Sequence, residues 1–332
     1  MADAPVSGAL SYIVVGLEST YGSVSGALAA DKMIAFGHNQ KITVDRNMNT
    51  NPVYGLGSPH PSKVVSGVYE GRLTITFNLA STYFMELVMG NCSDGGAAPK
   101  THTYADNTGY AVTSFTTANG INLDTDSVYA YLGCVVDSCE MTFRVGEPVG
   151  VTLNVLYANE TKATTGIDAT PAVDAELPMV FSEGSVQLPS GTTLARVQSL
   201  TLRIIKNAEL VRGLGSRVAT AAVWKTTRFE FDMEISYENA DLVADMYGQA
   251  TGPLTATMPA GEASLVLTCT NSGAGSATRS LVFTLSTTYI TSDSLPQSVE
   301  DHMVQTVRGF SINAPTSIIG SDNTATSPLV SS

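Results

Sequence analysis

One segment of this chain occurs twice, and this repeat constrains the fold more than any other feature. Lys41–Ser58 matches Ser199–Ser216 without a gap, at an offset of 158 residues (199 minus 41). Both copies end in the same Gly-Leu-Gly-Ser block. An ungapped match fixes the register of the segment that it covers. The repeat therefore predicts two copies of one module in which equivalent residues superpose, Thr43 on Thr201 and Gly57 on Gly215.

The similarity continues after the repeat as a pattern of alternation. Arg72–Ala80 and Arg228–Ser236 both alternate polar and apolar residues, and we align them from their first arginines. A period of two residues is typical of a strand that buries one face. Each strand leads into a short helix-like stretch that ends at a glycine, and glycine suits a helix C-cap. These glycines are Gly90 and Gly248, again 158 residues apart.

The composition favours strands and turns throughout the chain. Only 14% of the residues are charged and 43% are hydrophobic, which is typical of β-structure with enough apolar residues for two cores. Residues 159–177 lack periodicity and are rich in Ala and Thr, as in a linker. We therefore predict an all-β fold with minor α content, divided into copy 1 at 1–158, a linker with little regular structure at 159–177, and copy 2 at 178–332.

Further strands are expected after the helix-like stretches. In copy 1, strands at Cys139–Val145 and Val149–Tyr157 flank a tight turn that contains Gly146 and Pro148. Their counterparts in copy 2 are expected at Ser264–Thr270, Ser280–Tyr289 and Gln305–Asn313.

Charge and hydropathy argue against several partners. The formal charge of −13 argues against a surface that grips nucleic acid, because phosphate binding needs clustered Lys and Arg. It does not exclude a wall along which DNA passes without sticking. No apolar run approaches the roughly 18 residues of a membrane span, and the N-terminus lacks the basic region of a secretory signal. We expect synthesis in a cytoplasm and no membrane partner.

No catalytic, cofactor-binding or metal-binding residues are predicted. The chain lacks GxSxG, HExxH, P-loop and dinucleotide-binding motifs, so we expect no enzyme and no cofactor. The four histidines are isolated in the sequence: His38, His60, His102 and His302. The four cysteines lack a CxxC spacing, and we interpret them as reduced core residues: Cys92, Cys134, Cys139 and Cys269.

The alternating strands also present polar faces. From periodicity alone, such a face is the solvated side of a sheet. The charged positions on it balance, with five Lys or Arg and five Asp or Glu. The face comprises Lys41, Thr43, Asp45, Arg72, Thr74, Thr76, Asn78, Glu140, Thr142 and Arg144 in copy 1, and Ser199, Thr201, Arg203, Arg228, Glu230, Asp232 and Glu234 in copy 2.

Two long loops follow the repeated strand, Arg46–Gly71 in copy 1 and Lys206–Trp224 in copy 2. Both are too long for simple hairpins, and long loops in compact domains are usually functional or disordered. Prolines stiffen the first loop and lower its cost of ordering on docking. The alternative to a docking role is a mobile surface excursion.

This order of segments resembles the major tail tube proteins of long-tailed viruses, in the form with two modules. The resemblance covers nearly the whole chain, and its most specific part is YLGCVVDSCEMTFRVGEPVGVTLNVLY at Tyr131–Tyr157. It also rests on a polar strand at Ile42–Val44, the Asn- and Gly-bearing loop, the strand from Arg72 and a helix at Tyr83–Met89. In copy 2 it rests on the segments that begin at Pro178, Arg196 and Arg308.

The resemblance implies a β-sandwich with a short flanking helix for each module. It also implies rings of six-fold or pseudo-six-fold symmetry that stack into a tube for genome delivery. Three chains of two modules would then form one ring. The implied location is the virion. The implied partners are further copies of the chain, the tape measure, terminator and tip or baseplate proteins, and double-stranded DNA in transit.

The same resemblance assigns roles to the polar faces and the loops. The polar faces become the wall of the lumen, and the loops reach a neighbouring subunit or ring. We take the inter-ring candidates to be Asn47, Asn51, Pro52, Tyr54, Pro59, Arg212 and Arg217.

A rival interpretation is a β-sandwich protein that binds or decorates a virion surface without catalysis. A carbohydrate binder would show clustered exposed aromatic residues. This chain has one Trp, Trp224, and scattered tyrosines, which disfavours the rival. Rings or tubes under the microscope would favour the tube, and persistent monomers would favour the rival.

Overall fold

The computed structural model describes residues 11–23, 35–96, 100–107, 112–121, 127–163, 177–188, 191–237, 241–249, 251–254, 262–271, 279–297, 302–313, 315, 317–322 and 329. Strands dominate these ranges, and two short helices accompany them. The predicted all-β fold with minor α content is confirmed. Among the described residues, no helix has the length and apolar character needed to cross a membrane.

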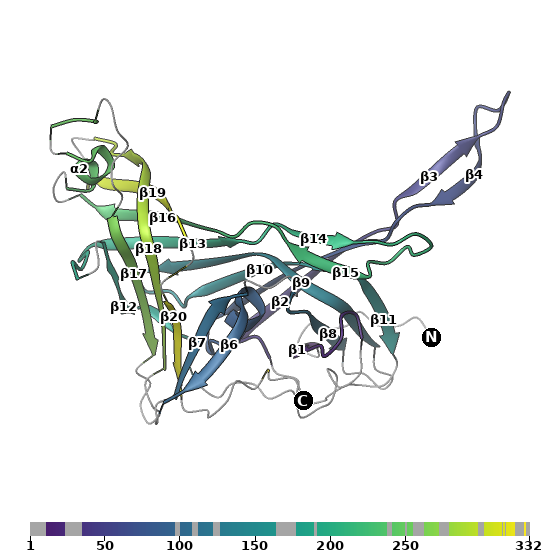
Figure 1. The fold of residues 1–332 in the computed structure, drawn as a ribbon, viewed down its shortest axis with the longest axis horizontal. Helices are drawn as coiled ribbons and strands as arrows, with labels where there is room; N and C mark the ends of the chain where they lie inside the picture. The colour runs from purple at the N-terminus through teal and green to yellow at the C-terminus, as the bar shows by residue number, and fades with distance from the viewer. Residues whose placement is uncertain are drawn as a thin grey trace.

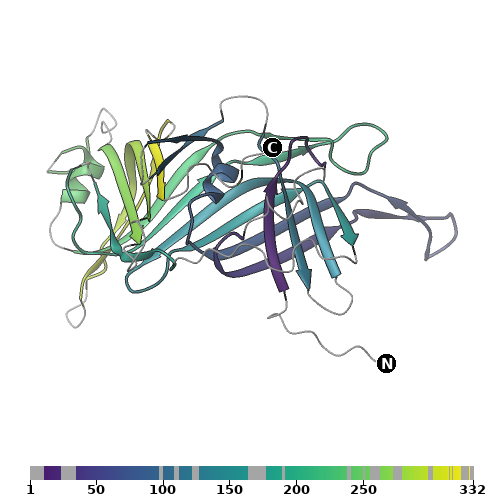
Figure 2. The same cartoon turned by 90° about the horizontal axis from the view of Figure 1, so that it is seen from below.

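The first half of the chain forms two sheets that share one long strand (Figures 1 and 2). One sheet has the order β2-β5-β10-β9, and the other has the order β1-β8-β9-β11. The strands span β1 Ser11–Leu17, β2 His38–Asn47, β5 Glu70–Asn78, β8 Phe115–Ile121, β9 Ser127–Arg144, β10 Gly150–Tyr157 and β11 Asn159–Ala163.

The second half shows the same order of pairing, strand for strand. One sheet has the order β13-β16-β19-β18, and the other pairs β12 with β17, β17 with β18, and β18 with β20. The strands span β12 Val180–Gln187, β13 Val197–Ile205, β16 Arg228–Ser236, β17 Glu262–Asn271, β18 Arg279–Ser294, β19 Val304–Ser311 and β20 Ser317–Asp322.

The shared strands β9 and β18 pass from one sheet into the other. Each has a residue of positive φ where it changes partners, Gly133 at φ 62° in β9 and Thr287 at φ 22° in β18. In β9 the glycine is also required by space, because a Cβ there would lie 2.9 Å from the Cβ of Ala158. A left-handed residue lets a strand turn sharply without ending.

Two strand pairings join the halves. β9 pairs with β13 from Ser199↔Arg144 to Ile205↔Ser138, so the first sheet of each half becomes one main sheet of order β2-β5-β10-β9-β13-β16-β19-β18. The hairpin of β6 (Gly90–Gly95) and β7 (Lys100–Asp106) also crosses between halves, because β7 pairs with β20. The second sheets of the two halves, here called the covering sheets, lie against one side of the main sheet (Figure 1).

The core lies between the main sheet and the covering sheets. The predicted apolar faces are buried there: Leu73, Ile75, Phe77, Phe229, Phe231 and Met233 are each at most 3% exposed. Helix α1 (Phe84–Met89) buries most of its residues, and α2 (Asp241–Tyr247) buries Leu242. Gly90 has φ 93° and Gly248 has φ 74°, which confirms the predicted glycine ends of both helices.

The structure corrects three expectations. The linker is not irregular throughout, because Asn159–Ala163 forms β11 on the edge of β9; its residues 164–176 lie outside the described residues. The two long loops are extended β-hairpins rather than irregular segments. The alignment of Arg72 with Arg228 is wrong by two residues, since β2–β5 pairs Thr43 with Thr74 and β13–β16 pairs Thr201 with Asp232.

Candidate channel-lining face and assembly arms

The side of the main sheet away from the core is polar, and we call it the polar face. Every polar-face residue named from the sequence lies on this side, because the alternate residues are half-buried in β2 and buried in the other strands. The strand registers bring them into rows across both halves of the chain. One row joins Lys41, Thr76, Thr152, Glu140, Arg203 and Glu230, and another joins Thr142, Thr201, Asp232 and Arg308.

Ion pairs link the acidic and basic side chains of the polar face. Arg203 binds Glu140 at 2.7 Å and Asp232 at 2.5 Å, so it bridges the two halves at the β9–β13 junction. The hydrogen bonds that Arg203 donates to Asp232 and to Glu140 raise the pKa of its guanidinium. Arg308 binds the other oxygen of Asp232 at 3.2 Å. The pairing leaves a face with little net charge.

Sequence reasoning missed part of this face. Thr152 and Asn154 of β10, and Thr306 and Arg308 of β19, continue the rows between the predicted residues. Asn154 accepts from Thr74 at 3.2 Å and donates to Ser138 at 3.0 Å. The signal was present, because both strands alternate in burial as β5 does. With Arg308 included, the polar face has six positive and five negative residues instead of five of each.

A long hairpin, here called arm 1, projects from the body (Figure 1). It consists of β3 (Thr50–Tyr54) and β4 (Pro61–Ser66), and all of Thr50–Ser66 is exposed. Four inter-ring candidates lie on it: Asn51, Pro52, Tyr54 and Pro59. Asn47 lies at its root and accepts a hydrogen bond from the backbone N–H of Asn49.

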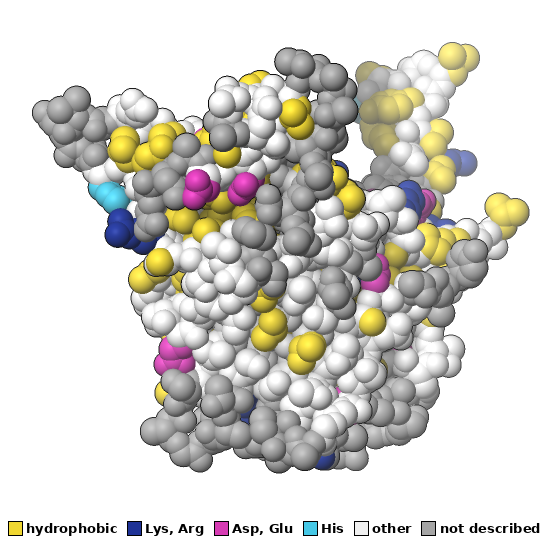
Figure 3. Space-filling view, turned by 60° about the vertical axis from the view of Figure 1, so that its left-hand side comes forward, with side chains coloured by type: hydrophobic (Ala, Val, Ile, Leu, Met, Phe, Trp, Pro, Cys, Tyr) yellow, Lys and Arg dark blue, Asp and Glu magenta, His cyan; other side chains and the backbone are white. Residues whose placement is uncertain are grey.

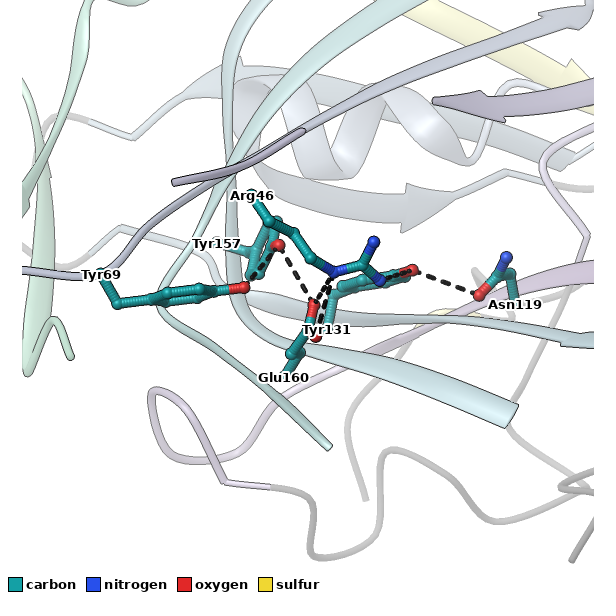
Figure 4. Close-up of polar contacts among 6 residues, drawn as sticks. All are labelled: Arg46, Tyr69, Asn119, Tyr131, Tyr157 and Glu160. Carbon is teal, nitrogen blue, oxygen red and sulfur yellow. Dashed lines mark hydrogen bonds and ion pairs between the residues drawn. The ribbon is translucent and has the colours of Figure 1, made fainter. Parts of the chain in front are cut away.

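A polar cluster anchors the root of arm 1 to the body (Figure 4). Arg46 binds Glu160 at 2.8 Å, and Glu160 also accepts from the hydroxyl of Tyr157 at 3.2 Å. The hydroxyls of Tyr69 and Tyr157 lie 2.9 Å apart, and Arg46 donates to Tyr131 at 3.4 Å. Burial raises the pKa of Tyr131 to about 12 and also raises the pKa values of Tyr69 and Tyr157.

A second hairpin, here called arm 2, leaves the same side of the molecule closer to the body (Figures 1 and 2). It spans β14 (Ala208–Val211) and β15 (Ala221–Trp224). Trp224 donates its indole N–H to the carbonyl of Val136 at 3.0 Å. Lys206 lies fully buried at the root, 2.5 Å from Asp106 and 4.6 Å from the centre of the Trp224 ring.

Arm 2 holds the root of arm 1. Arg212 donates to the carbonyl of Tyr69 at 3.1 Å, Arg217 donates to the carbonyl of Gly67 at 2.9 Å, and the N–H of Tyr69 donates to the carbonyl of Arg217 at 2.9 Å. The two arginines named as inter-ring candidates are thus engaged within their own chain.

The tips of the two arms have the same structure. Gly57 has φ 81° and Gly215 has φ 85°. In each tip the N–H of the final serine donates to the first glycine of the block, at 3.2 Å in arm 1 and 3.3 Å in arm 2. The leucines between the glycines, Leu56 and Leu214, are fully exposed at 110% and 108% of the reference area.

Two expectations about single residues are wrong. Cys134, Cys139 and Cys269 are buried free thiols as predicted, but Cys92 is only half-buried. His102 is not isolated, because it lies beside Asp94 and Cys92 in the β6–β7 hairpin. The sequence hid this cluster because its members come from two strands.

An all-β scaffold with one long polar face and two projecting arms is typical of a structural protein. A family model described as phage tail tube protein matches residues 8–317. The chain therefore belongs to the phage tail tube protein family, as the resemblance indicated, and is a structural protein of the virion tail. Membership implies assembly into a tube in contact with other tail components. A search of curated proteins found no match.

Proposed function

We propose that three copies of this chain close into a ring of pseudo-six-fold symmetry, and that stacked rings form a channel for genome delivery. The observation that carries the proposal is the equal order of strands in the two halves. In the main sheet, β9 is the last strand of the first half, and it pairs with β13, the first strand of the second half. β18 is the equivalent last strand of the second half. Repeating that junction between chains would pair β18 with β2 of a neighbour.

The strand registers define which residues of β9 and β18 are equivalent. In the first half Thr76 faces Thr152, which faces Glu140. In the second half Glu234 faces Thr306, which faces Ser294. Because Glu234 lies 158 residues after Thr76, Ser294 occupies the position of Glu140.

This equivalence gives a register for ring closure. Glu140 pairs with Arg203 across the β9–β13 junction, and the residue 158 positions before Arg203 is Asp45. Ser294 of one chain would therefore lie opposite Asp45 of the next. Both strands have an open side there in the described structure, since β2 pairs only with β5 and Ser292–Ser294 pairs only with β19.

Closure would also remove the exposed strand edges. An unpaired edge is a template for uncontrolled association, and a closed barrel has none. Three main sheets of eight strands give about 24 strands, and barrels of more than about 16 strands enclose an aqueous channel. The polar face would line this channel, with the cores and covering sheets outside it.

The charge balance of the polar face suits passage of DNA. A duplex carries about one negative charge per 1.7 Å and binds strongly to a net basic surface. Ion pairs engage three of the six basic groups of the face, those of Arg203, Arg228 and Arg308. On the side of the molecule that carries α2, few of the described side chains in view are charged (Figure 3), which suits close packing against neighbours.

The arms would connect the ring to its neighbours. Arm 1 is long, wholly exposed and fixed at its root, so it is the segment best placed to reach the next ring. The apolar tips at Leu56 and Leu214 would give each ring six similar contact points. At the ends of the tube, the same surfaces would meet the tape measure, terminator and tip or baseplate proteins.

Electron microscopy of the assembled protein tests the ring. We expect a tube whose symmetry shows three chains and six similar lobes per ring. Six full-length chains per ring would refute the proposed closure. Persistent monomers would instead favour a decoration protein on the virion surface.

A charge change on the polar face tests the conduit separately. Thr76→Lys together with Glu234→Lys alters one equivalent position in both halves and makes the net charge of each chain about three units more positive. We expect rings to form and genome release to slow, most strongly at low salt. Thr76→Gln with Glu234→Gln is the matched control. Release at the normal rate at every salt concentration would show that these residues do not line the path of DNA.

A further inference from the structure

The β6–β7 hairpin brings three metal-ligating side chains together. Cys92 and Asp94 lie two residues apart in β6 and so point to the same face, and Asp94 pairs with His102 of β7. Nδ1 of His102 lies 2.6 Å from Oδ1 of Asp94, and Sγ of Cys92 lies 3.5 Å from the same oxygen. The three ligand atoms all lie within 4.8 Å of one another.

The surroundings fix one ligand and leave solvent access to the others. His102 is fully buried, and its ring packs edge-on against Tyr83 at 5.7 Å between ring centres. The side chain of Asp94 is 21% exposed and Cys92 is half-buried. The nearest cationic residue on the same face of β7 is Lys100, which donates to the carbonyl of Gly96. An ion can therefore enter from the Asp94 side and meet a preoriented imidazole.

We propose that Cys92, Asp94 and His102 form a binding site for Zn²⁺. A thiolate, an imidazole and a carboxylate are the donors that zinc takes, and three protein ligands leave a fourth position for water. Tetrahedral zinc separates its ligand atoms by about 3.3 to 3.6 Å. The contact between Asp94 and His102 would open by about 1 Å to admit the ion, and Asp94 has the freedom to move because it lies at the solvent edge.

A metal ion here would stiffen the hairpin through which the first half of the chain pairs with the second. β7 is the strand of the first half that pairs with β20 of the second half. Binding would tie the edge strand β6 to β7 through side chains as well as backbone. The proposal does not depend on ring formation, because every ligand comes from one chain.

Cobalt titration of the reduced, tag-free full chain tests the site. A thiolate bound to Co²⁺ gives a near-ultraviolet charge-transfer band, and we expect one equivalent of metal to produce it. Cys92→Ser should abolish the band although three cysteines remain, because those three are buried away from the cluster. Asp94→Asn should weaken binding at least about tenfold. His60→Gln, an exposed histidine on arm 1, is the control and should change nothing.

Thermal unfolding gives a second readout for the same site. Zinc in excess should raise the Tm of the wild-type chain by roughly 2–4 °C, and it should leave the Tm of Cys92→Ser unchanged. No band in the wild type, or a band and a Tm shift that persist in Cys92→Ser, would overturn the proposal and leave an ordinary His–Asp ion pair beside a thiol.

Discussion

The two arms carry the same tip on different roots. Both end in Gly-Leu-Gly-Ser with matching φ angles and an exposed leucine. Arm 1 is exposed along its whole length, and an ion pair and tyrosine hydroxyls hold its root. Arm 2 lies against the body through Trp224 and Lys206, and its arginines grip the root of arm 1.

This difference shows how one repeated segment serves two environments. The tips, whose leucines are fully exposed, have the same sequence in both arms. The roots, which pack against different neighbours, differ in sequence. Position 66 is an exposed serine in arm 1, while the position 158 residues later is the indole that fastens arm 2. The side chain at this position of the root therefore distinguishes arm 2, which is fastened to the body, from arm 1.

The largest effect is expected at the root of arm 2. Trp224→Ala removes a large ring, its hydrogen bond to Val136 and the cover over Lys206, and should lower the free energy of unfolding by about 3 kcal/mol. Ser66→Ala at the equivalent position of arm 1 should change it by less than about 0.5 kcal/mol. Denaturant unfolding of both variants checks the contrast, which equal effects would contradict.

Removing a charged group should also lower the free energy of unfolding more at the root of arm 2 than at the root of arm 1. Lys206→Met leaves Asp106 without the cation it faces and should cost about 2 kcal/mol. Arg46→Met should cost less than about 1 kcal/mol, because Arg46 is 40% exposed and water screens its pair with Glu160. The free energies of unfolding measured at low and high salt decide between them. A larger loss in the Arg46 variant would reverse the comparison.

Alkaline pH should weaken the root of arm 1. The folded pKa of Tyr131, about 12, exceeds the ordinary value of about 10, so the stability it contributes is complete below pH 10 and falls as pH rises toward 12. The pKa of Lys206 is lowered by burial, and its contribution has the opposite sign, rising with pH. Tyrosinate absorbance and unfolding measured together across this range test the prediction. Stability that stays level from pH 10 to 12 in Lys206→Met would contradict it.

The smallest effect on the single chain is expected at the tips. Leu56→Ser and Leu214→Ser should each change the free energy of unfolding by less than about 0.5 kcal/mol, since neither leucine is buried. Both should reduce the yield of tubes seen by microscopy. Normal tube yield in both variants would remove the leucines from the stacking contact.

Local pattern predicted the strands of this fold but not all of their registers. The alternation from Arg72 identified β5 and its buried face correctly, yet aligned it two residues away from the observed register. A shift of two preserves every face, so the alternation alone could not detect the error. The pairing of β7 with β20 was also beyond the sequence, because it joins strands about 220 residues apart and depends on the completed fold.

The candidate site was likewise predicted only in part from the sequence. All the predicted polar-face residues lie on one side of the main sheet because alternation determines the face. The root of arm 1 could not be found in this way, since Arg46 and Glu160 are 114 residues apart and Glu160 lies in a segment that composition marked as linker. Contacts that depend on how elements pack cannot be found from the period of each element.

The most direct test of the account is a disulfide across the proposed junction between chains. In a Cys92→Ser background, Ser294→Cys with Asp45→Cys places two thiols opposite each other on neighbouring strands, within bonding distance. Val44→Cys replaces Asp45→Cys in the control, because a one-residue slip turns the thiol to the other face. We predict oxidised rings that run on a non-reducing gel as species of up to three chains and no larger, with none in the control. Cross-linked species beyond three chains, or no cross-link in assembled tubes, would contradict closure through β18 and β2.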